Sequence, residues 1–191
     1  MISKKDAWNL LTKYNKEEFH LKHARTVALC MKGFAEKLGY KEEQDLWEIV
    51  GMLHDIDFEL YPLEHCKKAK EILEENAIDP KIIHAVISHG FGICSNIKPE
   101  HTMEKILFAI DELTGLIGAA ALMRPSKSFQ DMTLKSVKKK FKDKGFAAGC
   151  DREVIMDGAG YLNFEIDDLL NQTLEILKVY EENINNSKYY F

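Results

Sequence analysis

The fold of this chain is decided by one stretch, Ile49-Val50-Gly51-Met52-Leu53-His54-Asp55-Ile56-Asp57, in which an apolar run leads directly into polar side chains. An imidazole and a carboxylate are costly to bury unless something satisfies them. A divalent cation does so, because it accepts a neutral imidazole nitrogen together with a carboxylate oxygen. On its own the dipeptide His54-Asp55 favours a simple turn at a helix end, because adjacent His and Asp occur by chance in many proteins. Other polar residues on apolar segments make it informative.

Two further candidates stand on apolar segments far along the chain. His23 directly precedes apolar residues at positions 24, 27, 28 and 31, which is the spacing of a buried helix face. Asp111 lies within the apolar segment 106–117, where an unpaired carboxylate would be costly. A helical bundle could bring these residues to His54 and Asp55. Such nitrogen and oxygen donors suit Mn, Fe, Ni, Co, Zn or Mg, and they leave positions open for water and substrate.

A helix His, a later adjacent His-Asp and a distant helix Asp form a pattern that resembles the HD-type metal-dependent phosphohydrolases. The matching residues are His23, His54, Asp55 and Asp111, and the resemblance covers about residues 16–120. It implies an all-α helical bundle that binds a divalent metal ion. It also implies hydrolysis of a phosphoester by metal-activated water, as a phosphomonoesterase or a phosphodiesterase. The substrate would be a nucleotide or another small phosphorylated metabolite.

Some members of that superfamily hold two metal ions and use extra histidines. His65, just after Pro62, and His89, at the end of an apolar helix, occupy the expected segments. With Asp55 bridging, these two histidines would hold a second ion. The alternative is an exposed His65 and a His89 favoured by the dipole at a helix end, so one or two ions per chain remain open. The remaining histidines are left out of the metal site: His20, His84 and His101.

Residues outside the ligand set are candidates for proton transfer and phosphate binding. Asp57 and Glu59 could orient or deprotonate water, or protonate the leaving oxygen, although solvated loop acids are an equal alternative. Arg124 and Lys127 lie in a hydroxyl-rich turn after the Asp111 helix, and they are the expected substrate-binding cations.

Two other functions fit the same residues. A few HD-fold relatives are di-iron oxygenases with ligands of the same kinds. A non-catalytic module that binds a nucleotide for regulation is the second alternative. The complete set of four ligands favours the enzyme, because a sensor would be expected to lose one of them.

Composition limits the remaining choices. With 191 residues, of which 46% are hydrophobic, the chain suits one domain over residues 1–191, with a metal-site core at about 16–120 and additional helices at about 130–185. No apolar stretch approaches the roughly 18 residues of a membrane span, and we expect a cytoplasmic protein without a membrane partner. The net charge of -5 argues against binding extended nucleic acid. The expected partner is a small phosphorylated substrate, and a homodimer remains open.

Caps and breakers predict where the helices begin and end. Ser3 caps a first short helix, Gly39 stops a second, and Asp79-Pro80 begins a fifth. No alternating strand pattern interrupts them. Four scattered cysteines lack paired spacing and suggest neither a zinc knuckle nor a disulfide framework. After the first helix, the expected helices and short segments are 17–38, 41–53, 62–75, 79–89, 102–123, 133–144, 151–156 and 165–182, with a frayed tail at 185–188.

Overall fold

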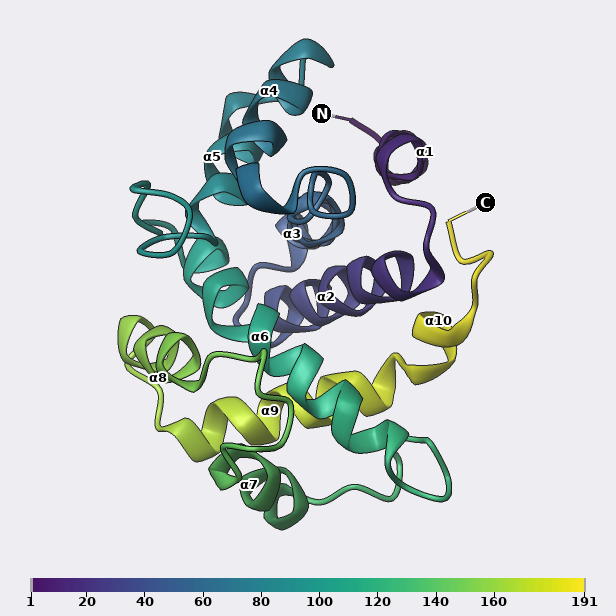
Figure 1. The fold of residues 1–191 in the computed structure, drawn as a ribbon, viewed down its shortest axis with the longest axis vertical. Coiled ribbons are helices and arrows are strands. Elements are labelled where there is room, and N and C mark those ends of the chain that lie inside the picture. The colour runs from purple at the N-terminus through teal and green to yellow at the C-terminus, as the bar shows by residue number, and fades with distance from the viewer. Residues whose placement is uncertain (1, 191) are drawn as a thin grey trace.

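The computed structural model describes residues 2–190, and these form ten α-helices and no β-strand (Figure 1). The all-α class predicted from the sequence is confirmed. Short 3-10 turns at Lys41–Glu43 and Pro62–Glu64 precede the third and fourth helices. The helices are α1 (Lys4–Tyr14), α2 (Glu18–Lys37), α3 (Gln44–Leu53), α4 (Lys67–Glu75), α5 (Pro80–Ser88), α6 (Thr102–Leu122), α7 (Leu134–Lys142), α8 (Arg152–Tyr161), α9 (Ile166–Val179) and α10 (Glu181–Asn185).

The helix ends follow the expected local chemistry. The Ser3 hydroxyl accepts a hydrogen bond from the Asp6 amide at 3.1 Å, and the Asp79 carboxylate accepts one from the Lys81 amide at 2.8 Å. Gly39 has a φ of +85°, in the left-handed region that terminates many helices. The Ser3 and Asp79 side chains thus satisfy backbone amides that would otherwise lack partners in the first turn of each helix.

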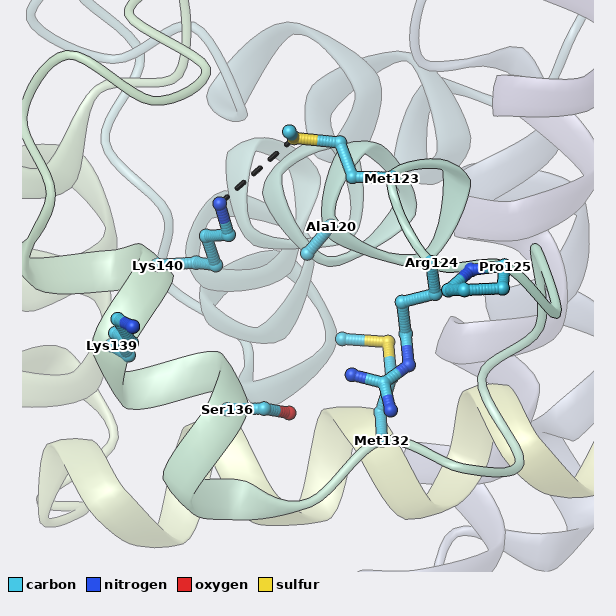
Figure 2. A pocket seen from close by; sticks show the side chains of 8 residues that line it. All are labelled: Ala120, Met123, Arg124, Pro125, Met132, Ser136, Lys139 and Lys140. Atoms are coloured by element: carbon cyan, nitrogen blue, oxygen red, sulfur yellow. Dashed lines mark hydrogen bonds between the residues drawn. The ribbon is translucent and has the colours of Figure 1, made fainter.

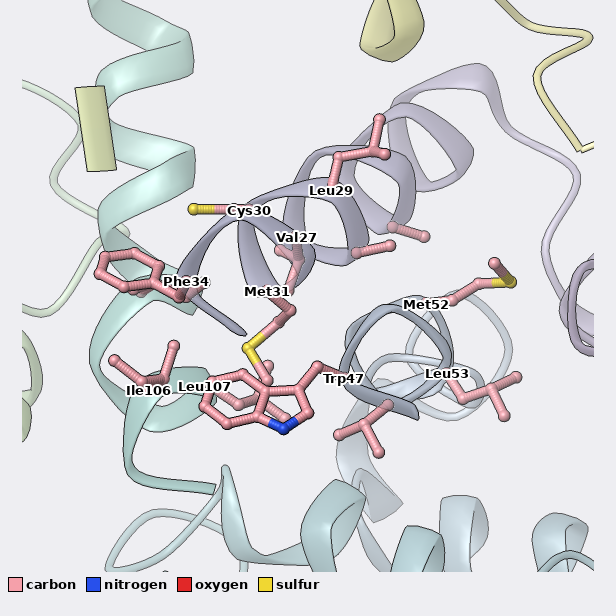
Figure 3. Close-up of a cluster of buried hydrophobic side chains, with 14 of the residues drawn as sticks. Val27, Leu29, Cys30, Met31, Phe34, Trp47, Met52, Leu53, Ile106 and Leu107 are labelled. Carbon is pink, nitrogen blue, oxygen red and sulfur yellow. The ribbon is translucent and has the colours of Figure 1, made fainter. Parts of the chain in front are cut away.

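Three central helices form the part of the core that positions the polar residues. Phe34 of α2, Trp47 of α3 and the neighbouring Ile106 and Leu107 of α6 gather there (Figure 3). Helix α2 packs against both α3 and α6. These contacts bring together the segments that carry His23, the His54-Asp55 pair and Asp111.

Helix α3 approaches α2 closely because residue 51 is a glycine. A Cβ atom at Gly51 would lie 2.9 Å from the Ala28 Cα and 2.9 Å from the Met31 Cγ, closer than real Cβ atoms come to their neighbours. The glycine therefore sets the depth at which the carboxyl end of α3 enters the core. His54 and Asp55 follow directly after that end.

The later helices complete the bundle around α6. Helix α8 packs on α6, while α9 contacts both α2 and α7 (Figure 1). The segment expected at 151–156 continues as α8 to Tyr161, and the single helix expected at 165–182 is divided into α9 and α10. In the described part of the chain, no helix combines the length and the apolar character that a membrane crossing requires.

Beyond the exposed residues 185–188, where a frayed tail was predicted, the chain returns to the core at Tyr190. Tyr190 is only 7% exposed, and its ring centroid lies 5.1 Å from that of Trp8. The Tyr190 hydroxyl donates a hydrogen bond of 2.9 Å to the carboxylate of the buried Glu48. A buried acid needs such partners, and the Lys4 Nζ at 3.3 Å provides a second one for Glu48.

Candidate metal centre

Four of the predicted ligands meet at one point. The His23 Nε2 lies 3.2 Å from the His54 Nε2 and 3.0 Å from the Asp111 Oδ1. The His54 Nε2 lies 3.2 Å from the same Asp111 oxygen. The Asp55 Oδ2 closes the group at 3.4 Å from His54 and 3.7 Å from His23. Helices α2 and α6 and the turn after α3 thus contribute one shared donor cluster, which we call the first cluster.

The other carboxylate oxygen of Asp55 faces two more histidines. The Nε2 atoms of His65 and His89 lie 3.1 Å apart. The Asp55 Oδ1 is 3.4 Å from the His65 nitrogen and 3.6 Å from the His89 nitrogen. These three donors form the second cluster. Asp55 therefore stands between the two clusters and directs one oxygen to each.

Hydrogen bonds at the opposite ring nitrogens fix how three of these imidazoles are oriented. The His54 Nδ1 donates to the Gly51 carbonyl at 2.7 Å, and the His89 Nδ1 donates to the Val86 carbonyl. The His65 Nδ1 donates to the Asp57 Oδ1 at 2.8 Å. In the neutral imidazoles, the proton is thereby held at Nδ1 and the Nε2 lone pair points into the cluster.

Because the His54 proton is held at Nδ1, the His54 Nε2 is an acceptor that faces carboxylate acceptors, and positive charge stabilises this arrangement. The nitrogen lies 3.2 Å from the Asp111 Oδ1 and 3.4 Å from the Asp55 Oδ2, and the His54 ring is fully buried. Neighbouring ligands of a cation bound at about 2.1 Å stand roughly 3 Å apart, so the observed spacing fits a bound ion. The first cluster offers four donors and the second offers three with Asp55 shared, so either could hold a divalent metal ion.

Without a metal, protons must take the place of the cation. Burial disfavours the charged form of His54, but the Asp55 and Asp111 carboxylates outweigh it and hold the pKa of His54 well above its ordinary 6.5. Burial likewise opposes ionisation of Asp55 and Asp111, yet the facing histidines, His54 foremost, lower the pKa of both carboxyls well below 3.8. In the metal-free centre, His54 is therefore stabilised as an imidazolium that faces the Asp55 and Asp111 carboxylates.

These shifts predict how the stability of the metal-free protein depends on pH. The raised pKa of His54 contributes stability that is complete below pH 6.5 and is lost as the pH rises through the folded-state pKa. The lowered pKa values of Asp55 and Asp111 contribute stability that is present above pH 3.8 and lost on further acidification. With chelator present, we expect the melting temperature to peak between about pH 4 and 6.5.

Thermal melts across pH with and without saturating Mn²⁺ check this expectation. The ion binds neutral imidazoles, so it should abolish the decline of the melting temperature on the alkaline side. A metal-free protein whose melting temperature keeps rising from pH 6.5 to 9 would contradict the charge assignment.

Asp57 and Glu59, the expected proton-transfer residues, are committed to structural contacts. The buried Asp57 accepts hydrogen bonds from the His65 Nδ1 and, at 2.8 Å, from the Ala69 amide, so both of its oxygens are engaged. Glu59 accepts the amides of Lys16 and Glu17 at 2.8 and 3.1 Å, ahead of α2. The geometry thus favours a positioning role for Asp57 and a capping role for Glu59 over the proton transfer we expected.

Arg124 and Lys127, the expected phosphate-binding residues, are not brought to the two clusters. The Arg124 Nε lies 2.7 Å from the Asp131 Oδ1, and Arg124 lines a separate pocket with Lys139 and Lys140 (Figure 2). Lys127 is exposed in the turn after α6. The physical reason is distance along the helix, because 13 residues at 1.5 Å each separate Asp111 from Arg124 by about 20 Å.

A pocket of about 480 Å³ opens over both clusters, and its walls include residues that the sequence did not identify. Its lining includes Phe19 and His20 from α2, Phe58 after α3 and Ile93 after α5. His20, which the sequence does not assign to the metal site, lies in the pocket lining. Aromatic residues next to the ligand positions were the available signal.

Glu112 and two cysteines also line the pocket. Burial, and then the neighbouring Asp111 charge, raise the pKa of Glu112 to about 7. Cys94 lines the pocket beside the second cluster, and Cys150 lines it near Glu112. The position of Glu112 next to Asp111 was a usable signal in the sequence. The cysteines carried none, because their spacing follows no ligand pattern.

The remaining histidines serve the fold. The His84 Nδ1 lies 2.9 Å from the Glu104 carboxylate, between α5 and α6. The His101 Nδ1 accepts the Met103 amide at 3.2 Å and caps the start of α6. Neither is among the residues that line the pocket above the clusters.

Comparison with known protein families gives one match, the HD domain, over residues 21–116. This range is about half of the chain and contains all six donors of the two clusters. Comparisons with curated proteins and with solved structures gave no match. HD domains form a superfamily of metal-dependent hydrolases that bind divalent ions. On the strength of the match and the helical fold, the chain belongs to the HD domain family.

Proposed function

We propose that this protein is a phosphohydrolase that uses two divalent metal ions to cleave a small phosphorylated compound. The observation that carries the proposal is Asp55, which directs one oxygen to each of two clusters of inward-facing acceptors. Membership of the HD domain family supports a metal-dependent hydrolase. When bound, the two ions would supply the Lewis acidity that activates water and polarises a phosphoryl oxygen.

The residues of the chain have distinct roles in this proposal. His23, His54 and Asp111 hold the first ion, His65 and His89 hold the second, and Asp55 bridges them. Asp57 positions His65 by accepting a hydrogen bond from its Nδ1. The Gly51 and Val86 carbonyls do the same for His54 and His89. The ligands are therefore set in place before an ion binds, which reduces the cost of ordering them.

The pocket walls favour a substrate with a compact phosphate and an uncharged, apolar leaving group. Phe19 and Ile93 line the pocket yet are 76% and 64% exposed, so they offer apolar surface that a ligand could cover. Among the described lining residues there is no lysine or arginine. Positive charge for the phosphate would then come from the ions alone, which disfavours a polyphosphate.

Metal analysis combined with phosphate-release assays tests the proposed function. Purified protein loaded with Mn²⁺, Ni²⁺, Co²⁺, Mg²⁺ or Fe²⁺ should release phosphate from monoesters or cleave diesters, with two ions per chain. His65→Gln should lose one ion and at least tenfold in kcat/KM, whereas His84→Gln, a matched change outside the clusters, should lose neither. Oxygen consumption with Fe²⁺ and no phosphate release would instead indicate the oxygenase chemistry.

Truncation of the pocket wall should weaken substrate binding selectively. Phe19→Ala removes a ring that could cover the leaving group, so KM for phenyl phosphate should rise about fivefold while kcat stays near the wild-type value. KM for methyl phosphate should change little, because its leaving group is too small to reach this wall. Leu63→Ala removes a residue that is 99% exposed and outside the pocket, and serves as the control. Equal effects on both substrates would contradict the proposed wall.

A further inference from the structure

A pair of cysteines lies beside the second cluster and takes no part in the proposed hydrolysis. The Sγ atoms of Cys66 and Cys94 are 2.7 Å apart, although 28 positions separate the two residues in the sequence. Cys66 directly follows His65, and Cys94 lies in the loop after His89. The two cysteines look unrelated in the sequence, because their spacing follows no paired motif.

The backbone around the two sulfurs is adapted to their contact. Cys66 has a φ of +66°, a left-handed conformation that is uncommon for a residue with a side chain and costs free energy. Residue 90 is a glycine, and a Cβ atom there would collide with the sulfurs of both Cys66 and Cys94. A strained residue and a glycine are thus both needed to place the two thiols together.

The two thiols differ in access. Cys94 is exposed and lines the pocket, so a small reagent can reach its sulfur. Cys66 is buried behind it. Of the other cysteines, Cys30 is buried in the core, and Cys150 lies against Glu112 on another wall of the pocket. An oxidised Cys94 would therefore meet Cys66 before any other thiol.

We propose that Cys66 and Cys94 are a modification site at which a hydroperoxide forms a reversible disulfide. The sulfur of Cys94 attacks a peroxide oxygen, the O–O bond breaks, and a sulfenic acid and one water (or alcohol) result. The sulfur of Cys66 then attacks the sulfenic sulfur, an S–S bond forms, the S–O bond breaks and the sulfenic oxygen leaves as water. Two thiols lose two electrons and two protons in total, and the peroxide is reduced by two electrons.

The bond would join the two chain segments that carry His65 and His89. One sulfur belongs to the residue after His65, and the other belongs to the loop whose first residue follows His89. Oxidation would thus close a covalent loop over residues 66–94, which begins one residue after His65 and contains His89. The inference rests on the positions of the sulfurs and the backbone, and it stands whether or not the protein hydrolyses phosphoesters.

Thiol mapping after peroxide treatment tests the site. Full-length protein, freed of metal with chelator, is treated with hydrogen peroxide, alkylated, weighed intact and digested. We expect loss of two thiols together, a mass lower by two hydrogens, and a cross-linked peptide pair containing positions 66 and 94. These thiols should disappear on the order of tenfold faster than Cys30. The melting temperature should rise by about 5 °C and return on reduction, because the new loop restricts the unfolded chain.

Variants separate this pair from general oxidation. Cys150→Ser should form the disulfide at the wild-type rate. Cys66→Ser should form none, and its Cys94 should proceed to sulfinic acid. The proposal is overturned if Cys66 and Cys94 remain free at tenfold excess peroxide. It is also overturned if wild-type Cys94 overoxidises with Cys66 unchanged, or if Cys94→Ser loses thiols as fast as the wild type.

Discussion

Asp55→Asn is expected to lower kcat/KM by roughly three orders of magnitude and to remove at least one of the two metal ions. The reason is the position of Asp55 between the clusters, with Oδ2 3.4 Å from the His54 Nε2 and Oδ1 3.4 Å from the His65 Nε2. An amide keeps the shape but turns one of these oxygens into an NH₂ group, which cannot bind a cation. The remaining ion should also bind more than tenfold weaker, because a negative charge is lost.

Metal stoichiometry after equilibrium dialysis, together with steady-state kinetics, measures these effects. Asp57→Asn provides a graded comparison, because Asp57 contacts only His65 among the donors and reaches the metal through it. We expect a 10-fold to 100-fold loss there, confined to one ion. The melting temperature of the metal-free Asp55→Asn protein should itself change, because the substitution removes a carboxylate from the charged groups around His54. Two bound ions and wild-type kcat/KM in Asp55→Asn would remove the bridging role.

The contrast between Asp55 and Asp57 shows which parts of the centre could be predicted from the sequence. His54 and Asp55 follow an apolar run, and Asp111 lies inside another. The cost of burying a polar side chain therefore identifies each of them from its own local sequence. Asp57 has the same local setting, but its role depends on His65 and the Ala69 amide. Those partners come from a segment whose direction is set by packing, which no local pattern describes.

Arg124 and Lys127, the cations after α6, do not lie at the two clusters for a related reason. A turn that follows a ligand-bearing helix looks close to the site in sequence, yet Asp111 lies in the middle of α6 and Arg124 lies beyond its end. The rise of an α-helix carries the turn about 20 Å away. Helix ends with a local cap or glycine were predictable, as Ser3 and Gly39 show, whereas the end of α8 and the division between α9 and α10 were not. The contact between Tyr190 and Glu48 depends on distant partners and was not predictable.

Gly51→Ala is expected to lower the free energy of unfolding by about 2 kcal/mol, although alanine normally stabilises a helix relative to glycine by roughly 1 kcal/mol. The added Cβ would lie 2.9 Å from the Ala28 Cα and 3.0 Å from the Ala28 nitrogen. These are backbone atoms of α2 and cannot rotate away as the end of a side chain can. Helix α3 must therefore move outward, and the contacts at the core of Figure 3 loosen.

Gly118→Ala is the matched control, because Gly118 lies within α6 and a Cβ atom there would meet nothing within 4 Å. This change should raise the free energy of unfolding by about 0.5 to 1 kcal/mol, so the two substitutions should have opposite signs in denaturant titrations. Gly51→Ala should also weaken metal binding at the first cluster. The Gly51 carbonyl accepts a hydrogen bond from the His54 Nδ1, and His54 directly follows α3, so a shift of α3 displaces this ligand. A stabilised Gly51→Ala protein with full metal affinity would show that the close contact of α2 and α3 does not set the position of the ligands.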